Sequence, residues 1–149
     1  MYEGPTKEAP IIVAQAMDSG AQWIAPDVLL SEIAERMRED DVGALPVGEN
    51  DRPIGMVTDR DIVVCGLDGR ADPLELSARD VMSRLIVYCN ANENLEYAVT
   101  IMVSKRICRL PVIDENRRMV GMLSLGDIAA KASPSLLVET LRAVSAHHT

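Results

Sequence analysis

Two short stretches of the chain place a hydroxyl side chain three residues before a carboxylate. Thr58 precedes Asp61 and Ser124 precedes Asp127, in each case after a run of apolar residues. If a strand ends at the hydroxyl and a helix begins there, the first backbone N–H groups of the helix are free to bind an anion. The carboxylate, one turn further on, can accept hydrogen bonds from adjacent hydroxyl groups of a ligand. The same residue types also stabilise helix starts without any ligand, so capping is the alternative interpretation.

These two stretches belong to an internal repeat. Leu45-Pro46-Val47 recurs as Leu110-Pro111-Val112, a displacement of 65 residues (111 − 46), and Gly55-Met56 recurs as Gly121-Met122, a displacement of 66 (121 − 55). One residue has therefore been added between the matched blocks, in a polar stretch where an insertion costs little. Matches that keep one offset over this length indicate a duplication.

Each copy predicts the same order of elements, β-α-β-β-α. Leu30, Ile33, Ala34 and Met37 have the spacing of one buried helical face, and the spacing returns at 95–102. After each helix, two apolar runs flank a polar turn and predict a hairpin. The hairpin strands are expected at 44–47 and 54–57 and at 110–113 and 119–123, with a short strand before each helix at 22–24 and 85–88 and a final short helix near Asp59 and near Gly126.

A repeat of about 60 residues buries too little surface to be stable alone. The predicted fold class is therefore α+β of the α/β type, in which two tandem β-α-β-β-α repeats share one core about a pseudo-twofold axis. We expect an N-terminal extension at 1–12, a first repeat at 13–66, a linker at 67–78, a second repeat at 79–131, and a C-terminal helix and tail at 132–149.

The tail predicts one more helix. Ser133-Pro134 is typical of a helix start, and Leu137, Leu141 and Val144 then form a single apolar stripe. Such a stripe needs a partner, which is either the body of the same chain or a second subunit.

Composition argues against several classes of protein. Fifteen basic and 23 acidic residues among 149 give a net charge of −8, and aromatic residues are 3%, so we expect no nucleic-acid binding. The absence of a long apolar run and of a secretory signal predicts a cytoplasmic protein with no membrane contact. Three cysteines without a C-x-x-C spacing and two terminal histidines predict no metal site, no catalytic residues and no enzyme activity.

Both copies resemble the cystathionine-β-synthase domain, or CBS domain, and together they resemble the paired arrangement called a Bateman module. The resemblance covers residues 13 to 131. It rests on the Leu-Pro-Val strand in both copies and on the strand-to-helix segments 55–61 and 121–127. These segments follow the family's nucleotide motif, which places a Ser or Thr and then an Asp after a glycine and hydrophobic residues.

The resemblance implies that an adenine nucleotide (AMP, ADP or ATP) or an adenosyl compound binds in a cleft between the repeats. The hydroxyls of Thr58 and Ser124 would then face the ligand, and the carboxylates of Asp61 and Asp127 would accept hydrogen bonds from ribose hydroxyls. No catalytic cofactor and no metal is implied.

Positive charge for a phosphate is distributed unequally between the copies. Arg109 lies where members of the family often carry a phosphate-contacting basic residue, and Arg60 is the second candidate. Their counterparts, Ala44 and Gly126, are uncharged. We therefore expect two clefts of unequal affinity.

The resemblance also implies a regulatory role. Without an attached enzyme or transporter domain, the module would signal to a separate, unidentified protein, and paired modules of this family usually form homodimers through helical faces. The alternative is a ligand-free interaction or dimerisation module in which Asp61 and Asp127 only cap helices.

Overall fold

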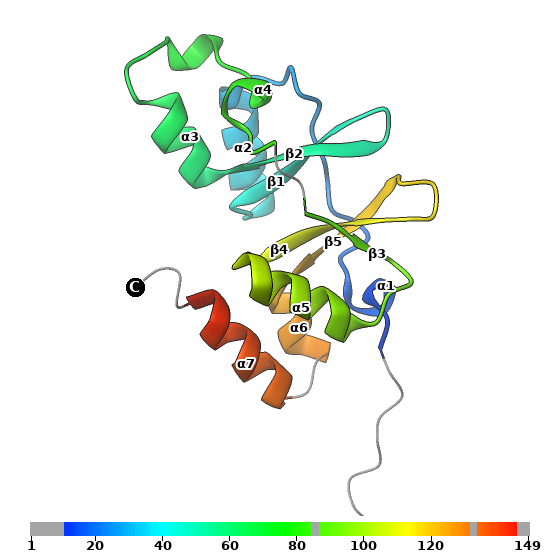
Figure 1. Ribbon diagram of the computed structural model, residues 1–149. Coiled ribbons are helices and arrows are strands. Elements are labelled where there is room, and N and C mark those ends of the chain that lie inside the picture. Colours follow the sequence, from blue (N-terminus) through cyan, green and yellow to red (C-terminus); the bar gives the residue numbers. More distant parts are fainter. Residues whose placement is uncertain (1–10, 85–86, 132–133, 146–149) are drawn as a thin grey trace, which may run out of the picture. The chain divides into compact units, whose positions relative to one another are not determined.

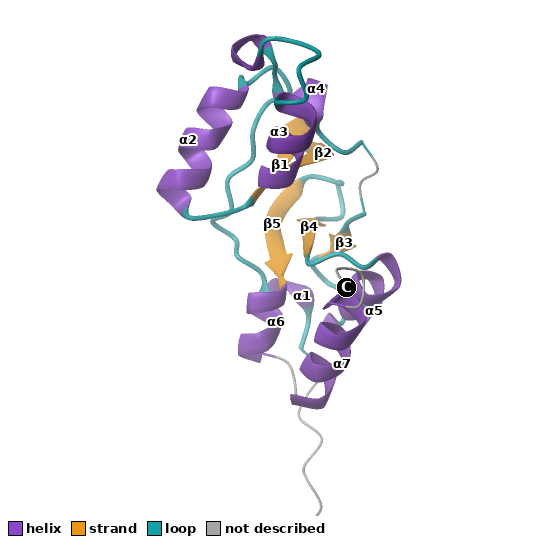
Figure 2. Cartoon of the chain, turned by 90° about the vertical axis from the view of Figure 1, so that its left-hand side faces the viewer, coloured by secondary structure: helices purple, strands orange, loops and turns teal. Residues whose placement is uncertain are grey.

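The computed structural model of the chain describes residues 11–84, 87–131 and 134–145, which form two compact units (Figure 1). Unit 1 comprises the described residues within 1–19, 88–114 and 120–149, and unit 2 comprises those within 20–87 and 115–119. The helices and strands of both units are coloured by type in Figure 2.

The two predicted amphipathic helices are α2 (Leu30–Asp40) in unit 2 and α5 (Leu95–Lys105) in unit 1. The predicted apolar face of α5 is buried throughout, and that of α2 is buried at Leu30, Ile33 and Met37. Ala34, which the spacing also placed on this face, is exposed, so the buried face of α2 is narrower than predicted. Each also ends at a left-handed residue, Asp41 (φ 51°) after α2 and Arg106 (φ 56°) after α5, whose backbone N–H bonds the last turn. The duplication therefore extends to the backbone conformation that terminates the helix.

The predicted hairpins are present in both units. In unit 2, β1 (Ala44–Glu49) pairs antiparallel with β2 (Arg52–Thr58). In unit 1, β4 (Arg109–Ile113) lies between β5 (Met119–Ser124) and β3 (Cys89–Asn90) in a three-stranded sheet, and β3 runs parallel to β4. The final helices follow directly, α3 (Asp59–Gly66) after β2 and α6 (Leu125–Lys131) after β5.

The strands expected before each helix are shorter than predicted. At 22–24 only Ile24 forms a bridge, parallel to Val47, and the chain then enters a turn at Pro26. Of the strand expected at 85–88, residues 85 and 86 lie outside the described part, and the expectation is wrong for residues 87 and 88. Tyr88 is exposed outside any strand, and pairing begins at buried Cys89. Cys89 is buried against β4, and this contact sets where the strand begins. The apolar run from residue 85 does not indicate that starting point.

Two four-residue helices complete the units. Each helix precedes one repeat in the sequence but packs in the unit that contains most of the other repeat. Helix α1 (Val13–Ala16) belongs to unit 1, where Val13 N donates to Glu93 O at 2.8 Å. Helix α4 (Ala78–Val81) belongs to unit 2, where Ala78 N donates to Val28 O at 2.9 Å. A 3₁₀ turn, η1 (Pro73–Glu75), precedes α4. Each unit is therefore assembled from both halves of the sequence.

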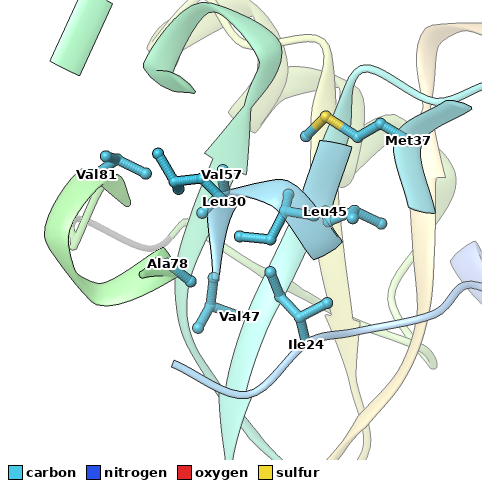
Figure 3. Packing of buried hydrophobic residues seen from close by; sticks show 9 residues of the cluster. Ile24, Leu30, Met37, Leu45, Val47, Val57, Ala78 and Val81 are labelled. Carbon is cyan, nitrogen blue, oxygen red and sulfur yellow. The ribbon is translucent and has the colours of Figure 1, made fainter. Parts of the chain in front are cut away.

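Apolar side chains from α2, β1, β2, α4 and the segment before α2 form the core of unit 2 (Figure 3). Its buried members are Ile24, Leu30, Ile33, Met37, Leu45, Val47, Val57, Ala78 and Val81. Removal of this much apolar surface from water is the main force that holds β1 and β2 beneath α2 and α4.

The tail helix α7 (Pro134–Ser145) packs against α5 and α6 of its own unit (Figure 1). The chain's own body therefore covers one face of α7, but this buried face is not the predicted stripe. Thr140 is fully buried and donates from Oγ1 to Leu136 O at 2.7 Å, whereas Leu141 is 42% exposed. Ser133 and the side chain of Val144 lie outside the described residues.

Across the described residues, no helix has both the length and the apolar character needed to cross a bilayer.

Candidate functional site

In unit 2, Thr58 and Asp61 meet at the point where β2 runs into α3. The Thr58 backbone N–H donates to Asp61 Oδ2 at 2.9 Å, and the Asp61 backbone N–H donates to Thr58 Oγ1 at 3.1 Å. This reciprocal pair is a capping box, which satisfies two backbone donors that the first turn of a helix leaves free.

The second copy repeats this geometry in unit 1. The Ser124 backbone N–H donates to Asp127 Oδ2 at 2.9 Å, and the Asp127 backbone N–H donates to Ser124 Oγ at 3.2 Å. The structure therefore brings together each predicted hydroxyl and carboxylate. In both boxes Oδ1 of the carboxylate accepts no hydrogen bond from the described residues, so an acceptor oxygen is left for a ligand.

The strand before each motif fixes its position. In unit 2 the Asp59 backbone N–H donates to Gly43 O at 2.9 Å, which ties the start of α3 to the residue before β1. In unit 1 the Leu125 backbone N–H donates to Cys108 O at 3.1 Å, which ties the start of α6 to the residue before β4. The rigid hairpin thus holds each helix start in the same place relative to its sheet.

The two motifs differ in the charges beside them. Arg109 begins β4 directly after Cys108. In unit 2 the residues at the corresponding positions, Ala44 and Thr58, lie opposite each other in the hairpin. Because the hydrogen bond from Leu125 to Cys108 repeats the one from Asp59 to Gly43, the same register places Arg109 opposite Ser124. In unit 2, Arg60 lies between the hydroxyl and the carboxylate. Both arginines are exposed, and neither forms an ion pair with another described residue.

Sequence reasoning missed one charged neighbour, Asp59. Its carboxylate lies over the backbone of Gly43, where a side-chain carbon would come within 3.0 Å of Asp59 Oδ2, and its Oδ1 accepts from Arg60 N at 2.8 Å. The counterpart of Asp59 in unit 1 is Leu125. Asp59 therefore increases the difference in charge between the two motifs, because the second motif has no acid at this position. Sequence reasoning could have found Asp59 from the run Thr58-Asp59-Arg60-Asp61.

Sequence reasoning also missed a third capping box. Ser77 N donates to Asp80 Oδ2 at 2.8 Å at the start of α4, and no strand leads into it. The hydroxyl–carboxylate spacing alone therefore marks a helix start. What distinguishes the two predicted motifs is their place at the end of a β-strand.

Unit 1 also contains a buried thiol and a partly buried carboxylate that are absent from unit 2. Cys89 is buried, and burial followed by the charge of Glu93 raises the pKa of its thiol from 9.0 to about 12. Glu93 Oε2 is buried without a hydrogen-bond partner among the described residues, while Oε1 accepts from Asn90 Nδ2 at 3.3 Å. The counterparts in unit 2 are the apolar Ile24 and Val28. A thiol held neutral in this way is a poor nucleophile.

Comparison with known proteins finds one family over most of the chain. The family model described as CBS domain matches residues 13–66 and 78–133. Hypoxic response protein 1 of Mycobacterium tuberculosis is 36% identical over 129 residues, which cover 86% of this chain and 90% of that protein. The crystal structure of Hypoxic Response Protein I with two coordinated zinc ions is 35% identical and superposes with a TM-score of 0.75, covering 83% of this chain and 100% of that one.

Two further solved structures share the fold at lower identity. The complex of CBSX2 with AMP has a TM-score of 0.72 at 22% identity and covers 81% of this chain and 95% of that one. The CBS domain pair of protein MJ0100 with 5′-methylthioadenosine and S-adenosyl-L-methionine has a TM-score of 0.72 at 19% identity and covers 82% and 95%. In the described part of the present chain, no group of three or more His, Cys, Asp or Glu side chains is placed to hold a metal ion.

Proposed function

Because this chain belongs to the CBS domain family, as a pair of tandem α+β repeats, we propose that it is a non-catalytic regulatory module that binds an adenine nucleotide. In this proposal AMP, ADP, ATP or an adenosyl compound is the ligand, and the module acts in the cytoplasm as a homodimer that signals to a separate protein. Thr58, Asp61, Ser124 and Asp127 form the two ribose-binding motifs, with Arg60 and Arg109 as the cations available to phosphate.

One observation carries the proposal. The capping box at the end of a β-strand is present twice with nearly the same distances, and in both copies one carboxylate oxygen is committed to the helix while the other accepts nothing from the described residues. A carboxylate held at a fixed angle by one oxygen is already oriented to accept from a ligand with the other, so it loses little side-chain entropy on binding.

The relatives support the class of ligand. Proteins of the same fold bind AMP in one solved structure and methylthioadenosine with S-adenosyl-L-methionine in another. Their ligands share an adenosine group and differ in the charge attached to the 5′ carbon. The motifs here would read the shared ribose, and the neighbouring charges would select among the 5′ groups.

Those charges support unequal binding by the two motifs. The second motif has Arg109 across the sheet and the uncharged Leu125 and Gly126 beside it, which favours a phosphate. The first motif has Asp59 over the Gly43 backbone, which opposes a phosphate, and the exposed Arg60 next to it offsets that charge only in part. We therefore propose that phosphorylated adenosine binds more tightly at the second motif than at the first.

The second candidate function is a ligand-free interaction module. It is favoured by the capping boxes themselves, because each motif already satisfies helix donors and the Ser77–Asp80 box does the same away from any sheet. In that case Asp61 and Asp127 act only on stability.

A panel of thermal melts of the full chain separates the two functions. A ligand at 100 times its dissociation constant adds about 2.7 kcal/mol, or roughly 5–10 °C for a chain of this size. The proposal predicts such a rise with at least one of AMP, ADP, ATP and S-adenosyl-L-methionine, each tested with and without magnesium. The absence of any shift at millimolar ligand would favour the ligand-free module.

A further inference from the structure

The end of α5 in unit 1 carries three exposed cations, Lys105, Arg106 and Arg109, which we call the α5 basic cluster. Lys105 is the last residue of the helix, Arg106 follows it, and Arg109 begins β4 after one short turn. None of the three forms an ion pair with another residue in the described part of the chain. In a chain with a net charge of −8, neighbouring cations without an acidic partner stand out from the rest of the surface.

Termination of the helix does not require these charges. Cations near the C-terminus of a helix interact favourably with its dipole, which would give the cluster a purely structural role. The first repeat tests that role, because α2 ends in the same left-handed conformation with two acids, Asp40 and Asp41, at the corresponding positions. Acids there oppose the dipole, and the helix still ends at the same place. The fold therefore accepts either sign of charge at this turn and does not account for the positive sign in unit 1.

The sign and the extent of the cluster indicate its partner. Three cations at one turn complement a short run of anionic groups, which they hold by charge-assisted hydrogen bonds. A long polyanion such as DNA or RNA would also meet the acidic remainder of the chain and be repelled by it. A short acidic segment of a protein avoids that repulsion, because it needs to contact only the turn between α5 and β4.

The cluster is continuous with the second ribose-binding motif. The Leu125 backbone N–H donates to Cys108 O at 3.1 Å, which joins the start of α6 to the residue before Arg109. Arg109 is therefore shared, since it is the cation available to a nucleotide phosphate at this motif and also one of the three cations of the cluster. A phosphate bound to Arg109 would leave two positive charges for a docked acidic segment.

We propose that the α5 basic cluster docks an acidic peptide segment of the protein that this module regulates, and that a nucleotide phosphate at the second motif competes with that segment for Arg109. This inference rests on the proposed function, which supplies both the regulated protein and the nucleotide. It adds the chemistry of the partner and a route by which the ligand affects it, because each of two competing ligands lowers the affinity of the other by the same factor.

Fluorescence anisotropy of a labelled oligoglutamate peptide, titrated with the full chain, tests the docking surface. The wild type is expected to bind the peptide saturably. The double variant Lys105→Asp, Arg106→Asp copies the acids that end α2, so the turn keeps a sequence that the fold accepts, and it should bind at least about tenfold more weakly. The matched control, Arg38→Asp with Arg79→Asp, changes the net charge equally at exposed positions of unit 2 and should leave the affinity unchanged.

Circular dichroism checks that each variant is folded. No binding by the wild type, or an equal loss of affinity in the two double variants, would overturn the docking surface. Tighter binding of a labelled single-stranded oligonucleotide than of the peptide would overturn the acidic protein segment as partner and assign the cluster to nucleic acid.

AMP and adenosine test the competition at Arg109. AMP is expected to weaken binding of the peptide to the wild type at least about fivefold, whereas adenosine, which has the ribose but no phosphate, should not. Arg109→Ala, which copies Ala44 of the first repeat, should remove the effect of AMP. A peptide affinity that AMP leaves unchanged would overturn the competition. The nucleotide melts, which need no peptide, then show whether the proposed function has failed with it.

Discussion

Replacement of Asp127 by Asn or by Ala separates helix capping from ligand binding. In the structure Asp127 Oδ2 accepts from Ser124 N at 2.9 Å, and Oδ1 accepts nothing from the described residues. Ala removes both oxygens. Asn can keep the cap with its amide oxygen, and its NH₂ group then replaces Oδ1, so that the outward group is a donor in place of an acceptor.

The two roles predict different magnitudes. Loss of the cap in Asp127→Ala costs about 1 kcal/mol, or roughly 2–4 °C in melting temperature, whereas Asp127→Asn loses only the charge at the helix start, about 0.3–1 kcal/mol. A hydrogen bond from ribose to a carboxylate contributes about 1.5–3 kcal/mol, so both variants are expected to bind nucleotide roughly 10–150-fold more weakly at this motif. The Asn variant should therefore lose much more affinity than stability.

Titration calorimetry with AMP and thermal melts of the same samples measure both quantities. Asp80→Asn is the matched control, since Asp80 Oδ2 makes the same contact to Ser77 N at 2.8 Å with no strand before it. This control should change stability as Asp127→Asn does and leave binding unchanged. If Asp127→Asn and Asp61→Asn each bind AMP as the wild type does, the ribose assignment is wrong and the boxes are caps only.

Three further predictions concern buried groups. Burial raises the pKa of the Cys89 thiol to about 12 in the folded state, so above pH 9 this thiol ionises first in the unfolded chain. The free energy of unfolding, measured with urea, should therefore fall by about 1.4 kcal/mol per pH unit above pH 9. Cys89→Ile should remove that slope. Glu93→Val, which copies Val28 of unit 2, should raise stability by about 1 kcal/mol by removing a buried oxygen without a partner, and a lower melting temperature would contradict this. Gly48→Ala should cost about 1–3 kcal/mol because its Cβ would overlap the Trp23 ring, and adding Trp23→Ala should recover part of that loss.

The elements that the sequence predicted best are those with a long periodic signal. The four-point spacing from Leu30 predicted α2, its copy predicted α5, and the Leu-Pro-Val runs predicted the hairpins in both units. Each of these elements buries its own apolar face, so its pattern reports its environment directly.

Elements without such a signal were missed or misplaced. Helices α1 and α4 have four residues each, too few for a period, and their exchange between units depends on backbone bonds such as that from Ala78 N to Val28 O, which no local pattern encodes. The face of α7 was misjudged by a fraction of a turn, because Thr140 satisfies its hydroxyl within the helix and can therefore be buried in place of Leu141.

The candidate site was predictable as residues but not as a function. Spacing alone paired Thr58 with Asp61 and Ser124 with Asp127, and the structure has both pairs in contact. The Ser77–Asp80 box shows why spacing could not decide their role, since capping and ribose binding require the same residue types at the same separation. The repeat of both motifs at strand ends is the feature that favours binding.

The most direct test of the central claim is calorimetric titration of AMP, ADP and ATP into the wild type and into the Asp61→Asn, Asp127→Asn double variant. The account predicts saturable binding of at least one nucleotide to the wild type and none to the folded double variant at the same concentrations. Equal binding by both proteins, or no heat from the wild type with any nucleotide at millimolar concentration, would contradict it.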